Sequence, residues 1–105
     1  MIVYEVIAVA DEALADEFQH YMSSRHVPDV LATGCFMSAV IARSGNNFQF
    51  RYEVADRATL DGYFRDHADA LRADVLEHFP SGIEFSRQIW DNIAEFTYNQ
   101  GSLLS

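Results

Sequence analysis

Short runs of β-branched and aromatic residues predict four β-strands along this chain. The runs cover residues 2–9, 35–43, 48–54 and 83–90. The run at 48–54 alternates apolar and polar residues, which is the period of a half-buried strand. It follows Gly45, Asn46 and Asn47, a composition typical of a tight turn. The second and third strands are therefore expected to pair as a β-hairpin.

The segment between the first two strands has apolar residues at helical spacing. It begins after Asp11, a residue suited to capping a helix, and its apolar positions are Leu14, Phe18, Tyr21 and Met22. The helix is expected to end at about Ser24, with a break in the chain at residues 26–29. Pro28 would then open a short second helical segment that ends before Gly34.

A second long helix is predicted between the third and fourth strands. Asp56 can cap its start, and Pro80 and Gly82 end it. The pattern allows a kink near residues 67–70. The buried stripe of this helix comprises Leu60, Phe64, Leu71, Val75 and Phe79.

The element order is strand, helix, two strands, helix, strand. This βαββαβ order is the ferredoxin-like α+β arrangement, a four-stranded antiparallel sheet with two helices on one face. We expect one domain over residues 1–93, followed by a C-terminal tail at 94–105 whose role the sequence leaves open.

The sheet face without helices is expected to be covered by a second copy. Apolar residues occupy both faces of the first two strands, which would leave a larger apolar surface than small monomers usually expose. A twofold homodimer through this face is the simplest cover. The alternative is that residues 93–104 fold over the sheet instead.

Composition excludes several classes of partner. The formal net charge is −9, with seven arginines and no lysine, so neither nucleic acid nor an anionic membrane is an expected partner of this acidic protein. The chain has no apolar run of membrane-spanning length and no leader-like N-terminus. Its single cysteine, Cys35, suits a reducing compartment, and we expect a cytoplasmic location.

Three segments together carry a family resemblance: MIVYEV at residues 1–6, HVPDVLATGCF at 26–36 and the stretch at 63–90. They resemble a small bacterial family of unknown function in the dimeric α/β-barrel superfamily. The resemblance extends to about Asn92 and implies a ferredoxin-like protomer that pairs sheet to sheet. It implies no activity. The wider superfamily includes cofactor-independent monooxygenases, haem-degrading enzymes and muconolactone-isomerase-like proteins, so the fold does not define the function.

His26 is the first candidate for chemistry, because a histidine can exchange a proton near neutral pH. It stands just before Pro28, where it could project into the space between helix and sheet, or simply satisfy a neighbouring carbonyl. Asp29 could orient His26, or could be a negative charge that favours the first turn of a helix.

Glu5, Arg51 and Glu53 share the strand parity of the face without helices. Arg51 could bind a carboxylate or phenolate ligand there. Alternatively, the three residues form an interfacial salt-bridge network. Arg87 has the opposite parity.

Tyr4, Tyr52 and Trp90 could stack on a flat organic ligand, although aromatic residues on strands more often serve a core or an interface. His67 lies on the apolar helical stripe and is expected in the core, whereas His20 and His78 should face solvent. The four histidines and Cys35 show no metal-ligand spacing, and no phosphate-binding or dinucleotide motif is present. We therefore expect neither a metal nor another cofactor.

Two hypotheses of different classes follow. The chain could be a dimeric module that binds a small molecule or regulates a partner. Alternatively, it could be a cofactor-independent enzyme, monooxygenase- or isomerase-like, that acts on a small aromatic or polyketide-like substrate. In the second case His26 would be the base and Arg51 would hold an anionic group.

Overall fold

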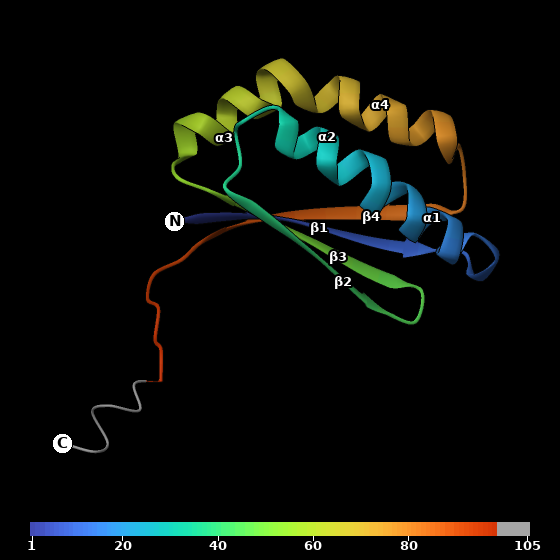
Figure 1. Cartoon of the computed structure of the whole chain (residues 1–105), viewed down its shortest axis with the longest axis horizontal. Coiled ribbons are helices and arrows are strands. Elements are labelled where there is room, and N and C mark those ends of the chain that lie inside the picture. The colour runs from blue at the N-terminus through green and yellow to red at the C-terminus, as the bar shows by residue number, and fades with distance from the viewer. Residues whose placement is uncertain (99–105) are drawn as a thin grey trace.

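Residues 1–98 of the computed structural model form an antiparallel sheet with a helical layer on one face (Figure 1). The strands are β1 (Ile2–Ala10), β2 (Ser38–Ser44), β3 (Asn47–Val54) and β4 (Ile83–Asp91). They lie in the order β2-β3-β1-β4, with every neighbouring pair antiparallel. The predicted ferredoxin-like βαββαβ fold is therefore confirmed.

The first helical segment is continuous, and the predicted break at residues 26–29 is wrong. A 3-10 turn at Glu12–Leu14 leads into α1 (Ala15–Tyr21), a π-helical turn at Met22–His26 and α2 (Val27–Ala32). The backbone N–H of Val27 bonds to the carbonyl of Met22, so the regular hydrogen-bond ladder already changes there. Pro28 has no backbone N–H to donate, and it comes directly after this change in hydrogen bonding. The helix therefore continues through the proline.

The second helical segment follows the predicted plan. It contains α3 (Arg57–Tyr63), a π-helical turn at Phe64–Ala68 and α4 (Asp69–His78). Asp56 caps it by accepting a hydrogen bond of 2.8 Å from the backbone N–H of Thr59. The π-helical turn overlaps the residues where the pattern allowed a kink.

The hairpin is confirmed, but β2 begins three residues later than predicted. Cys35 precedes the strand and packs partly buried against the core. Its backbone N–H bonds to the hydroxyl of Thr33, a local turn that delays entry into the sheet. Gly45, with φ of 60°, takes the first central position of the turn between β2 and β3.

Aromatic rings fill the space between sheet and helices. At one end, the fully buried ring of Phe18 meets the edges or faces of Phe48, Phe79 and Phe85, with ring centroids 5.1 to 6.1 Å apart. At the other end, the ring of Tyr4 lies 5.9 Å from that of Tyr52. Burying these rings, together with the aliphatic residues of the core, stabilises the protomer.

The opposite face of the sheet carries both apolar and polar side chains. Val40 and Trp90 are 59% and 49% exposed on it, and Glu5 lies partly buried between them. Beyond β4, residues 92–98 run away from the sheet without helix or strand (Figure 1). Ile93 and Phe96 are 97% and 90% exposed there. The described part of the tail therefore does not cover the sheet, and the rest of the predicted tail segment lies outside the described residues.

Within residues 1–98, no helix has both the length and the hydropathy needed to cross a membrane.

Candidate functional site

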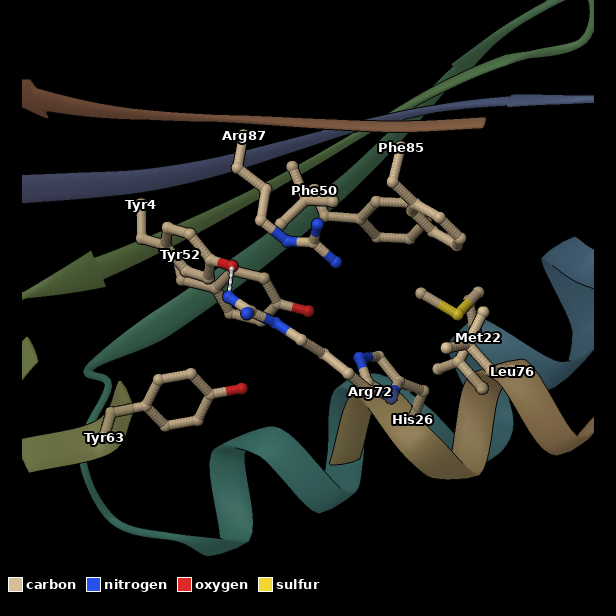
Figure 2. Close-up of a pocket in the computed structure, with 12 residues that line it drawn as sticks. Tyr4, Met22, His26, Phe50, Tyr52, Tyr63, Arg72, Leu76, Phe85 and Arg87 are labelled. Atoms are coloured by element: carbon tan, nitrogen blue, oxygen red, sulfur yellow. Dashed lines mark hydrogen bonds between the residues drawn. The ribbon is translucent and has the colours of Figure 1, made fainter. Parts of the chain in front are cut away.

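A cavity of about 230 Å³ lies between the sheet and the helical layer (Figure 2). Its floor comes from inward-facing residues of β1, β3 and β4, and its roof from the first helical segment and α4. It meets the surface beside Leu76 and Arg87, which are both exposed. Six of its lining residues carry a polar tip: Tyr4, His26, Tyr52, Tyr63, Arg72 and Arg87.

His26 enters the cavity from the π-helical turn at Met22–His26 (Figure 2). Turns of this kind widen a helix by one residue and are frequent at functional sites. The Nδ1 atom of His26 is buried and has no hydrogen-bond partner within residues 1–98. A buried nitrogen without a partner is costly, and His26 bears this cost beside the cavity that its ring lines.

Burial lowers the pKa of His26 from 6.5 to about 4, and the nearby Arg87 adds to this effect. The negative charges of Asp29 and Asp74 oppose it without reversing it. His26 is therefore neutral at pH 7 and can accept a proton or a hydrogen bond. Asp29 is exposed in the first turn of α2 and forms no hydrogen bond to the ring, so it does not orient His26 in this structure.

Two arginines reach into the cavity from opposite sides (Figure 2). Arg87 extends from β4, and Arg72 extends from α4 and donates a hydrogen bond of 3.1 Å to the hydroxyl of Tyr4. Arg87 lies over the ring of Phe85, and Arg72 over that of Phe64, at 5.5 and 5.8 Å from the ring centres. Neither forms an ion pair with a carboxylate of residues 1–98.

Tyrosines supply the other polar groups of the cavity. Burial raises the pKa values of both Tyr52 and Tyr63, the latter to about 12. Both hydroxyls therefore remain protonated at neutral pH and can donate hydrogen bonds. The ring of Tyr4 stacks against that of Tyr52 at an angle of 26° and leaves flat apolar walls around these polar tips.

Glu5, Arg51 and Glu53 lie on the other face of the sheet from His26, as their parity predicted. Glu5 accepts a hydrogen bond of 2.7 Å from Gln49 and lies 3.9 Å from the Nε atom of Arg51. Trp90 also donates to Glu5, at 3.4 Å. The side chain of Glu53 has no hydrogen bond or ion pair within residues 1–98. Arg51 and His26 therefore lie on opposite faces of the sheet and cannot belong to one site. Glu5 and Arg51 instead form part of the salt-bridge network that the sequence offered as an alternative.

The other singled-out residues divide between the two faces. Tyr4 and Tyr52 line the cavity, whereas Trp90 lies on the face without helices. His67 is partly buried with its ring 6.3 Å from that of Tyr63, and His20 and His78 are exposed. Among residues 1–98, no three His, Cys, Asp or Glu side chains are grouped as a metal would require.

Arg72 and Tyr63 were missed in the sequence, although a signal for Arg72 exists there. Ala68, Arg72, Val75 and Phe79 follow the spacing i, i+4, i+7, i+11 of one helix face. Three of these residues are buried apolar ones, so Arg72 is a cation at a core-facing position. Arg87 is the equivalent case on β4, where Ile83, Phe85 and Ile89 share its inward parity.

The fold places this chain among ferredoxin-like α+β proteins. A dimeric ferredoxin-like protein from an uncultured marine organism shares 11% identity with it, covering 93% of this chain and 100% of the other, with a TM-score of 0.69. An ethyl tert-butyl ether D family protein from Bacillus halodurans shares 14%, covering 89% and 100%, at a TM-score of 0.68. An antibiotic biosynthesis monooxygenase shares 14%, covering 90% and 100%, at 0.60. At such identities the likeness establishes the fold alone.

The chain belongs to the family described as domain of unknown function DUF4286, whose profile matches residues 1–93. A search of curated proteins finds no significant match.

The depressed pKa of His26 predicts a pH-dependent stability. The folded protein binds a proton at His26 less readily than the unfolded chain, so this contribution is complete above pH 6.5 and is lost as the pH falls towards 4. We expect wild type to lose about 2 kcal/mol of unfolding free energy through this group between pH 7 and 5. For His26→Gln, urea denaturation at fixed protein concentration should show a decrease in unfolding free energy between pH 7 and 5 that is smaller than that of wild type by about 2 kcal/mol.

His20→Gln, which alters an exposed histidine, is the matched control and should retain the wild-type pH dependence. Equal pH dependence in wild type and His26→Gln would show that His26 is not held neutral by its surroundings.

Proposed function

We propose that this protein is a homodimeric binding protein for a small, flat organic molecule, held in the cavity between the sheet and the helices. The observation that carries the proposal is a set of polar groups without carboxylate partners around an aromatic cavity: the neutral ring of His26 and the guanidinium groups of Arg72 and Arg87. A cavity that combines apolar walls with a few convergent polar groups is typical of small-molecule sites.

The dimensions of the cavity limit the ligand. Its volume of about 230 Å³ lies just below the ~300 Å³ at which sites for drug-sized molecules begin. The stacked rings of Tyr4 and Tyr52 offer flat surfaces rather than a rounded chamber. A compound of one or two fused rings fits both observations.

Leu76→Trp tests the position of the ligand. Leu76 lines the cavity and is 55% exposed, so a larger side chain there should obstruct the entrance while leaving the buried core intact. Native mass spectrometry of protein purified from its source should show a small non-covalent adduct on wild type. We expect Leu76→Trp to retain less than a tenth of it.

Leu31→Trp places the same residue on α2, outside the cavity lining, and should keep the adduct. An adduct that Leu76→Trp retains in full would place the ligand elsewhere. Wild-type protein that carries no adduct, and binds no small aromatic compound in ligand-observed NMR, would contradict the proposal.

The homodimer in this proposal forms through the sheet face without helices. One of the structurally similar proteins is a dimeric ferredoxin-like protein, which supports this arrangement. The exposed side chains of Val40 and Trp90 on the sheet face, and of Ile93 and Phe96 on the segment beyond β4, need a cover that residues 1–98 do not supply. A second copy would bury both groups, with the partly buried Glu5–Arg51 pair inside the interface.

Val40→Arg tests the dimer. Val40 is 59% exposed, so the change should leave the protomer folded, but a twofold interface would bring two added charges into one apolar surface. Sedimentation velocity at 10 μM should give a wild-type species of twice 11.9 kDa and a Val40→Arg species near 11.9 kDa. Leu31→Arg, in the helical layer, should remain dimeric. Monomeric wild-type protein would refute this interface.

A cytoplasmic location belongs to the same proposal. Cys35 is the single cysteine of the chain and is not in a disulfide, as is usual in a reducing compartment. Cell fractionation that recovers the protein outside the cytoplasm would remove this part of the proposal.

A second candidate is a cofactor-independent enzyme that acts on a small aromatic or polyketide-like substrate. It is favoured by the position of the neutral His26 ring, which lines the cavity and could accept a proton from a carbon acid there. Arg72 or Arg87 would then stabilise the negative charge of the resulting enolate.

The enzyme candidate predicts proton exchange with a flat carbon acid. With 2-indanone in D₂O, wild-type protein should accelerate deuterium incorporation next to the carbonyl, measured by NMR. His26→Gln should lose about 100-fold or more of that acceleration, because positioned general bases contribute about that much. Exchange at the uncatalysed rate with wild-type protein would leave the binding role without the enzymatic one.

A further inference from the structure

The arginines of this chain divide into two groups by their partners. Of the seven, five have a carboxylate oxygen within 4 Å. These ion pairs are Arg25–Asp74, Arg43–Asp16, Arg51–Glu5, Arg57–Asp61 and Arg65–Asp66. Within residues 1–98, Arg72 and Arg87 are the two without such a partner, and both line the cavity.

This division is notable because carboxylates are abundant. The chain has sixteen acidic residues, yet none of them lines the cavity. Asp74, two residues after Arg72, does not line the cavity and accepts hydrogen bonds from Tyr21 and Arg25, at 2.6 and 3.2 Å. The cavity therefore collects positive charge in an otherwise acidic protein.

We propose that the cavity ligand is a planar organic anion whose carboxylate is held between Arg72 and Arg87, with its ring against the tyrosine walls. This inference rests on the proposed function and adds the chemical class of the ligand. A guanidinium group matches a carboxylate because both are planar and can form two parallel hydrogen bonds. The aromatic walls favour a ring system over a compact inorganic anion.

The positions of the two arginines support a shared anion. Figure 2 shows Arg87 descending from the sheet and Arg72 crossing from α4, so that the two guanidinium groups enter the same space from opposite walls. Two cations directed into one partly buried space repel each other unless an anion lies between them. His26 lines the same cavity, and its neutral ring supplies a third polar group there.

A purely structural role for these arginines is the competing explanation. Each lies over an aromatic ring, and Arg72 also bonds to Tyr4. A cation–π contact at an exposed position contributes about as little as a surface ion pair, so these contacts do not by themselves explain why both guanidinium groups lie in the cavity and not beside surface carboxylates. A structural role would also leave ligand affinity insensitive to the charge of the ligand.

Titration calorimetry with a charged and a neutral ligand of the same shape tests the inference. The probes are 2-naphthoate and 2-naphthalenemethanol at pH 7. Wild type should bind the carboxylate at least tenfold more tightly. Arg72→Gln and Arg87→Gln should each lose at least tenfold in affinity for 2-naphthoate, with little change for the alcohol, because each removes charge-assisted hydrogen bonds to the carboxylate.

Arg57→Gln is the matched control, because it removes an exposed arginine that does not line the cavity and should leave both affinities unchanged. Arg72→Lys and Arg87→Lys keep the positive charge and serve as conservative variants. Circular dichroism of every variant shows whether it is folded. Equal affinities for both probes, unaffected by the variants, would overturn the anionic class and leave small-molecule binding intact. No binding of either probe at millimolar concentration would overturn the inference, and the adduct experiment with Leu76→Trp then decides the proposed function separately.

Discussion

Strand β1 lies between β3 and β4, and its hydrogen bonds to both neighbours decide which side chains face the helices. In this register Tyr4 and Val6 face the cavity, while Glu5 stands opposite Arg51 on the other side. Shifting β1 by one residue would exchange the two faces and place a carboxylate among the aromatic rings. The cavity, the polar network and the surface available to a partner all depend on this one alternation.

The strand alternation was also what made the fold predictable. The clean pattern of β3 and the cap at Asp56 are local signals, and both were confirmed. The continuity of the first helical segment was not predictable, because the sequence rules treat Pro28 as a break and do not describe a π turn ahead of it. Local sequence rules describe the conformational preference of a short segment. They do not include the packing of the first helical segment on the sheet.

The candidate site was predictable in part. Tyr4 and His26 were singled out, and the structure brings them into one cavity. Arg72 was missed because it comes from α4, and its closeness to Tyr4 depends on how that helix packs against β1. A charged residue at a core-facing position costs stability unless something compensates it. Hydrophobic periodicity identifies apolar core positions, so it overlooks a charged residue such as Arg72 that faces the core. A bound ligand can compensate such a charge.

The two π turns set the rotational phase of the helical layer. Each helical residue advances the chain by about 100° around the axis, so one extra residue in a turn redirects every side chain that follows. Met22–His26 precedes α2, and Phe64–Ala68 precedes α4, which carries Arg72. The first turn itself carries the cavity-lining Met22 and His26, and the second sets the direction of Arg72. Removing one residue from either turn would restore a regular helix and, at the same time, aim the cavity-facing side chains elsewhere.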